Sequence, residues 1–173
     1  MKYFMRLILL CGVLLVCHCS STDLFVRDAK IQKKPHRIAI GVFERRSLSI
    51  DSAVEKSIRE AVRFELLKKG YDAFIITTDG SRSASKPEEI MKITGENKAE
   101  ILLQGEIALN TSDALSSDNE SMLSITLHDA SGLILCALRY YTDKDITLVH
   151  VIREGTSTII DQLDTRLTAL AQR

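Results

Sequence analysis

The stretch RIAIGVFERRSLSIDSAVEKSIREAVRFELLKKGYDAFIIT, residues 37–77, decides the fold. Residues 37–43 are rich in β-branched and aromatic side chains and predict a strand. Residues 71–77 predict a second strand for the same reason, and a helix separates the two. A strand, a helix and a second strand of these lengths form a βαβ unit, whose crossover is almost always right-handed.

The helix of this unit has recognisable ends. Ser52 followed by Glu55 forms a capping box, which predicts the first turn. Gly70 stands where a glycine commonly ends a helix. Between these ends apolar residues recur at helical spacing, at Val54, Ile58, Ala61, Val62 and Leu66.

Further elements follow the βαβ unit. Pro87 opens a short helix that Gly95 ends. Residues 101–109 predict a third strand, in which Gly105 marks either a bulge or a close approach of another backbone. Residues 122–142 alternate between apolar and polar side chains on both sides of a turn, which predicts a hairpin.

The C-terminal segment allows two interpretations. Residues 146–154 either extend a terminal helix backward or form an edge strand, because Gly155 within a helix would cost about 1 kcal/mol. The terminal helix itself follows from the spacing of Ile160, Leu163, Leu167 and Leu170. The sequence therefore predicts one α/β domain over 36–173, with a mixed sheet of four to six strands and two or three helices mainly on one face.

Residues 1–18 predict a secretory signal peptide. Lys2 and Arg6 precede an uncharged apolar run over 7–17, and polar residues follow from Ser20. The run is short for a membrane-spanning helix, which needs roughly 20 apolar residues.

The end of the run, Val16-Cys17-His18-Cys19-Ser20-Ser21, resembles the signal of a bacterial lipoprotein. In that family a cysteine becomes the first residue of the mature chain and carries three acyl chains. The resemblance implies Cys19 as the lipid attachment residue, with Cys17 as the alternative, and His18 before Cys19 would suit the relaxed signals of spirochaetes. Each buried acyl CH₂ contributes about 0.8 kcal/mol, so several chains would hold the protein at a bilayer. The other interpretation is simple secretion with two incidental cysteines.

Residues 19–35 predict a flexible tether. They contain few periodic apolar positions and end in Lys33-Lys34-Pro35. A flexible segment of this length spans on the order of 20 Å, enough to lift a domain clear of a lipid surface.

The net charge and the cysteine content limit which partners and covalent links the chain can have. Without Lys2 and Arg6, 21 basic residues remain against 23 acidic ones, a formal charge of −2, which argues against nucleic acid as a partner. After loss or acylation of the N-terminal cysteines, Cys136 is the remaining thiol. One thiol forms no disulfide framework, and its apolar surroundings predict a buried, inert side chain.

The sequence offers no catalytic constellation, and we expect neither an enzyme nor a cofactor or metal site. His36, His128 and His150 lie far apart, and no metal-ligand spacing occurs. His128 and Asp129 are neighbours, but adjacent residues on a strand point to opposite faces, and Asp129 has a sufficient role in the turn. The cluster Glu44-Arg45-Arg46 follows the first strand, where α/β sheets tend to bind ligands, although a solvated loop explains it as well.

Three stretches resemble a domain of bacterial envelope lipoproteins found in CsgG, in LpoB and at the N-terminus of TolB. They are residues 38–43 with the following helix, residues 99–107 and residues 124–134. The resemblance implies a non-catalytic protein that binds an envelope partner or itself, anchored in the cell envelope and more specifically in the outer membrane facing the periplasm. The alternatives are a carrier of a small or lipidic ligand and a simply secreted soluble protein.

Overall fold

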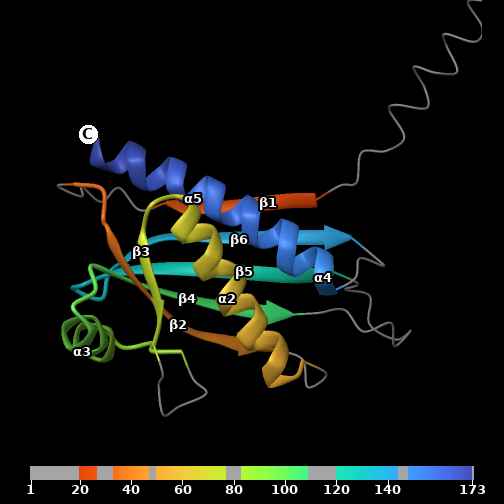
Figure 1. Cartoon of the computed structure of the whole chain (residues 1–173), viewed down its shortest axis with the longest axis horizontal. Helices are drawn as coiled ribbons and strands as arrows, with labels where there is room; N and C mark the ends of the chain where they lie inside the picture. Colours follow the sequence, from red (N-terminus) through yellow and green to blue (C-terminus); the bar gives the residue numbers. More distant parts are fainter. Residues whose placement is uncertain are drawn as a thin grey trace, which may run out of the picture.

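A computed structural model of the chain describes residues 20–26, 33–46, 50–76, 83–108, 120–143 and 148–172. These residues form a single α/β domain with a six-stranded mixed sheet, as the sequence predicts (Figure 1). The strands are β1 (Ser20–Val26), β2 (Arg37–Arg45), β3 (Asp72–Ile75), β4 (Ile101–Ala108), β5 (Glu120–Asp129) and β6 (Ile134–Asp143). The helices are α2 (Ser52–Lys68), α3 (Pro87–Asn97), α4 (Leu148–His150), the π-helical turn η1 (Val151–Gly155) and α5 (Thr156–Ala171).

The strand order in the sheet is β1-β6-β5-β4-β2-β3. Strand β2 is parallel to both β3 and β4. The other neighbouring pairs are antiparallel, and β5 and β6 form the predicted hairpin. The two edges of the sheet are therefore β1 and β3, which lie about 50 residues apart in the sequence but at opposite sides of the sheet.

The two crossover helices lie on opposite faces of the sheet. Helix α2 connects β2 to β3 at the edge, and α3 connects β3 back to β4, past β2. Crossovers between parallel strands are almost always right-handed. A right-handed crossover toward the edge and one back from the edge therefore pass over opposite faces of the sheet. Helix α5 packs beside α2, so most of the helical mass covers one face, as expected (Figure 1).

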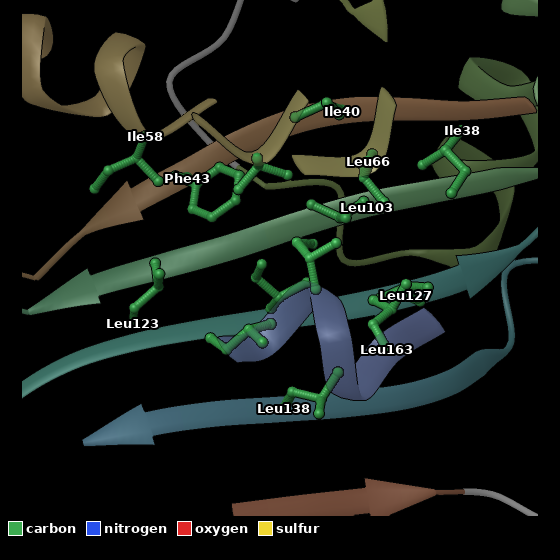
Figure 2. Close-up of a cluster of buried hydrophobic side chains, with 14 of the residues drawn as sticks. Ile38, Ile40, Phe43, Ile58, Leu66, Leu103, Leu123, Leu127, Leu138 and Leu163 are labelled. Carbon is green, nitrogen blue, oxygen red and sulfur yellow. The ribbon is translucent and has the colours of Figure 1, made fainter. Parts of the chain in front are cut away.

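The main core lies between the sheet and the helices α2 and α5. Figure 2 shows side chains of four neighbouring strands converging with Ile58 and Leu66 of α2 and Leu163 of α5. All three helical side chains are fully buried. A smaller cluster on the opposite face joins α3 to the sheet through Ile90, Ala39 and Leu102.

The first helix begins one residue earlier than the capping box predicts. The N-cap is Asp51, whose carboxylate accepts a hydrogen bond from the backbone N–H of Ala53. Ser52 already lies inside the helix, and Glu55 is engaged with the backbone N–H of Phe43. Gly70 has φ of +83°, as a glycine that ends a helix should.

In the remaining helices, one end differs from the prediction and the ambiguous C-terminal segment is resolved. Helix α3 continues past Gly95 to Asn97, and Lys98 takes the left-handed conformation that ends it. The described part of the ambiguous C-terminal segment, from Leu148 onward, is helical and not an edge strand. Gly155 lies inside this helical segment, and its lack of a side chain lets the ring of Tyr140 pack closely against it. A β-carbon at this position would lie 3.0 Å from the ring.

The prediction of a flexible tether over residues 19–35 is wrong for most of its described part. Residues 20–26 form β1, which pairs with β6 along its whole length. Leu24 packs against the main core, and the Gln162 amide of α5 donates to the Thr22 hydroxyl at 2.8 Å. The apolar residues of this segment, Leu24, Phe25 and Val26, are consecutive and do not alternate with polar ones, and the residues it pairs with lie 110 to 122 positions away, so its own sequence does not reveal the strand.

The second described part of this segment is also bound to the domain. Lys33 pairs with Glu100 at 3.2 Å, and Lys34 pairs with Asp164 at 2.6 Å. The predicted signal peptide and both candidate lipid attachment residues, Cys17 and Cys19, lie outside the described residues. Among the helices formed by the described residues, none is long and apolar enough to cross a bilayer.

Candidate interaction surface at the first strand

The three histidines of the predicted mature chain stay apart. His36 is exposed just before β2, and His150 lies on α4, 3.2 Å from Glu154. His128 is buried on β5. Within the described ranges, no three His, Cys, Asp or Glu side chains come close enough to hold a metal ion.

His128 and Asp129 do not form an acid–base pair. The Asp129 carboxylate accepts hydrogen bonds from the backbone N–H groups of Ser131 and Leu133, both at 2.9 Å, which fixes the hairpin turn. Burial lowers the pKa of His128, and the opposing effects of the Gly132 backbone and of Asp129 do not restore it. His128 is therefore a neutral side chain at pH 7, inside the domain.

The charge cluster after β2 is divided among separate structural contacts. Because each of its three side chains has a different partner, the cluster does not converge on one point. Glu44 accepts from the backbone N–H of Ser83 at 2.9 Å, Arg45 donates to the carbonyl of Ile50 at 3.1 Å, and Arg46 pairs with Glu106.

The neighbouring Gln104 closes this end of the parallel strands. It is 4% exposed, and its amide oxygen accepts from the Ser83 hydroxyl at 2.7 Å and from the backbone N–H of Ala84. Its amide nitrogen donates to the carbonyl of Ala84 at 3.0 Å. Both ends of the amide are used to hold the chain after β3 against the sheet, so the usual ligand position of an α/β sheet is filled by the protein itself.

A different part of the sheet carries exposed side chains. Strands β6 and β1 turn alternate residues away from α5, and several of these are partly or fully exposed. Phe25 is the largest, with 61% of its surface exposed. Aromatic side chains are enriched at protein interfaces, and Phe25, unlike the similarly exposed Phe64 on α2, lies on an edge strand that can pair with another chain. The residues of this β1–β6 surface are Asp23 and Phe25 from β1 and Ala137, Arg139 and Tyr141 from β6.

The β1–β6 surface combines an apolar and a charged row. Phe25 stands opposite Ala137, and Asp23 stands opposite Arg139 in the register of the two strands. Directly opposite residues lie about 5 Å apart between β-carbons, so this surface carries one acidic and one basic side chain at neighbouring positions. A hollow of about 480 Å³ lies at this place, lined by Asp23, Leu24, Phe25, Ala137 and Arg139.

Strand β1 also offers its edge. It is the outermost strand on its side of the sheet, and no described strand pairs with its outer side. An edge strand presents unpaired N–H and C=O groups that can pair with an extended segment of another chain. Because Phe25 lies on this same strand, the edge and the β1–β6 surface form one continuous region.

The other face of β1 borders a groove of about 590 Å³ against α5. Leu24 is its only aliphatic lining residue. A site for an apolar ligand would be concave and predominantly hydrophobic, which this groove is not. Its lining residues are Thr22, Leu24, Asp161, Gln162, Thr165 and Arg166.

The sequence analysis missed the β1–β6 surface because half of it was assigned to the tether. The one available signal is the order of residues 22–25, in which Leu24 alternates with polar Asp23 and is followed by Phe25. Four residues are too few to predict a strand without its partner.

Known proteins resemble this chain in structure but not in sequence. No family model matches the sequence. No curated protein matches it either. The structure resembles PelC from Paraburkholderia phytofirmans, solved as a dodecamer, with a TM-score of 0.59 at 12% identity over 84% of this chain and 98% of that chain. At this identity the likeness shows a shared fold and nothing more.

Two further solved structures are more distant. One is the lipoprotein GNA1162 from Neisseria meningitidis, with a TM-score of 0.42 and 16% identity over 76% of this chain and 99% of that chain. The other is TolB from Acinetobacter baumannii, with a TM-score of 0.45 and 14% identity over 86% of this chain and 32% of that chain.

Proposed function

We propose that this chain is a lipid-anchored, non-catalytic protein of a bacterial cell envelope that binds another envelope protein or further copies of itself. Acyl chains on Cys19, or on Cys17 as the alternative, hold it at the outer membrane facing the periplasm. The β1–β6 surface is its binding surface.

The exposure of Phe25 carries the proposal. An exposed aromatic side chain next to the oppositely charged Asp23 and Arg139 and an outer strand edge has the composition of an interface, an apolar centre with a polar rim. The site positions typical of an α/β enzyme give no support to catalysis, because Gln104 and the charge cluster are engaged in holding the fold. The polar lining of the groove beside α5 argues against the carrier alternative.

Self-association is the form of binding for which the comparison offers support. PelC, which shares the fold, was solved as a dodecamer. A chain that assembles with copies of itself must present a surface that a neighbouring copy contacts. Here the β1–β6 surface would be that surface.

Site-specific photocrosslinking tests the binding surface. A benzophenone amino acid placed at Phe25 should crosslink the protein to its partner in intact membranes. The matched control is Phe64 on α2, which is 63% exposed against 61% for Phe25. Crosslinks from position 25 but not from position 64 support the proposal, and the mass of the product distinguishes a second copy from another protein. Equal yields from both positions, or none from position 25, would refute it.

Metabolic palmitate labelling tests the anchor. The wild-type protein should take up label, and either Cys19→Ser or Cys17→Ser should abolish it. Label that persists in both variants, or that is absent from the wild type, would contradict lipid attachment.

A further inference from the structure

The position of β1 fixes how the domain meets the membrane. Cys19 is bonded directly to Ser20, which is the first residue of β1 and pairs with Thr142 near the end of β6. Consecutive Cα atoms lie about 3.8 Å apart, so an acylated Cys19 would hold this end of the sheet within a few ångströms of the lipid. No flexible spacer intervenes.

Strand β1 is bound firmly enough to transmit this constraint. All seven of its residues pair with β6, Leu24 packs against the main core, and Thr22 accepts the hydrogen bond from Gln162 of α5. The strand therefore belongs to the folded body, and its first residue moves with the domain.

We infer that the acylated protein stands on the bilayer in one orientation, with the end of the sheet where β1 begins against the lipid and the β5–β6 hairpin turn away from it. This inference rests on the proposed acylation at Cys19. The alternative is a domain that swings on a flexible tether and has no preferred orientation.

The chemistry of the membrane-proximal end fits a lipid surface. Val149, in the first turn after β6, is 70% exposed, the largest exposure among the large apolar side chains that the structure describes. The exposed Arg45 ends β2 at the same end of the sheet, since β2 and β6 both finish there (Figure 1). An apolar side chain reaching the headgroup layer and a cation near anionic lipid are both favourable.

The orientation has a consequence for the proposed binding surface. Strand β6 has ten residues and spans roughly 30 Å, and it would rise from the bilayer toward the solvent. The β1–β6 surface and the β1 edge would then face sideways, along the plane of the membrane. A partner anchored in the same leaflet, such as a second copy, could reach them directly.

Tryptophan fluorescence tests the orientation, because the chain contains no tryptophan. We would reconstitute the acylated, full-length processed protein in vesicles of phosphatidylcholine and phosphatidylglycerol that contain brominated acyl chains, which quench nearby tryptophan. The probes are Val149→Trp at the proximal end and Leu133→Trp at the distal end, both at exposed apolar positions. Circular dichroism and thermal unfolding establish that each variant folds.

The inference predicts that Val149→Trp loses most of its fluorescence in brominated vesicles and that Leu133→Trp keeps its own. Equal quenching of both probes, or quenching of Leu133→Trp alone, would overturn it. The mass of the N-terminal peptide distinguishes the two levels of failure. An acylated protein with an unquenched Val149→Trp probe refutes the orientation but leaves the anchor in place, whereas an unmodified cysteine refutes the anchor itself and, with it, the orientation.

Discussion

The ring of Phe43 on β2 lies directly over Gly105 on β4. A β-carbon on Gly105 would lie 2.2 Å from Cε1 of Phe43 and 2.6 Å from the carbonyl oxygen of Ser124 on the other neighbouring strand. The register between β2 and β4 shifts between Ile40 and Phe43, which brings the ring opposite the glycine. Of the two roles that the sequence allows for Gly105, the close approach is therefore the one that is found, and the irregularity lies in β2.

Gly105→Ala should destabilise the domain strongly. The added methyl group must displace a fully buried ring and a backbone carbonyl, and overpacking of a core typically costs about 1–3 kcal/mol. Chemical denaturation monitored by circular dichroism would measure this loss. Adding Phe43→Leu should recover part of it, because the ring contact is removed while the carbonyl contact stays. A neutral Gly105→Ala substitution would show that the strands can separate without loss.

Gly132 and Gly95 form a matched pair of glycines with opposite expectations. Gly132 has φ of +81°, and a β-carbon there would lie 2.6 Å from Cα of Pro87. Gly132→Ala should lower the free energy of unfolding by more than about 1 kcal/mol, because it adds both backbone strain and a clash. Gly95 lies inside α3 with nothing within 4 Å of its β-carbon position, so Gly95→Ala should stabilise the protein by up to about 1 kcal/mol. Urea denaturation of both variants checks the opposite signs.

Two neighbouring residues at the start of α2, Asp51 and Ser52, should contribute differently to stability. Asp51→Ala should lower the free energy of unfolding, because the N–H of Ala53 loses its acceptor. Ser52→Ala should change the stability little, because its hydroxyl contacts the exposed Asp51 side chain and no helix N–H. Thermal unfolding of the two variants compares them directly. The reverse order would restore the capping box that the sequence suggests.

The parts of the fold that follow from the sequence are those whose signals are local. The spacing of Ile58, Val62 and Leu66 predicts α2, and the alternation along β5 and β6 predicts their hairpin, because each pattern lies within one segment. Strand β1 depends on β6, and its paired residues there are 110 to 122 positions away. No pattern within a seven-residue segment can reveal such a partner.

At Gly155 the local sequence signal is misleading, because tertiary packing overrides it. Its low helix propensity argues for a break at this point, yet the helix runs through it. The ring of Tyr140 approaches so closely that a side chain would have to push it away. The gain from packing the buried Val151 and Gly155 of this turn against the sheet outweighs a propensity cost of about 1 kcal/mol. The candidate interaction surface could not be predicted for the same reason as β1, because Phe25 belongs to that strand.

Cys136 should be unreactive in the folded protein. It is fully buried, and burial raises the pKa of its thiol to about 12, so the reactive thiolate is scarce even at pH 9. A maleimide reagent should label Cys136 negligibly in the native protein and fully in urea. Cys136→Ala should abolish the labelling in urea if Cys19 is acylated. Rapid labelling of the native protein at Cys136 would contradict its burial.

Asp164 should make the domain sensitive to acid. Burial raises the pKa of its carboxyl. Hydrogen bonds from Lys34 and from the buried Tyr71 hydroxyl lower the pKa by more than burial raises it, so the net pKa lies below the usual value. A carboxylate whose pKa is lower in the folded state than in the unfolded state stabilises the fold above the unfolded pKa of about 3.9. That contribution is lost as the pH falls through the folded value.

The free energy of unfolding should therefore decrease below about pH 4 in the wild type and less steeply in Asp164→Asn, which has no proton to bind. Tyr71→Phe removes one of the two hydrogen bonds and leaves Lys34 in place, so its pH dependence should lie between the two. Urea unfolding at intervals from pH 7 to pH 2 measures all three slopes. Because Lys34 belongs to the segment first assigned to the tether, an unchanged slope in Asp164→Asn would also mean that this segment is not held by the ion pair in solution.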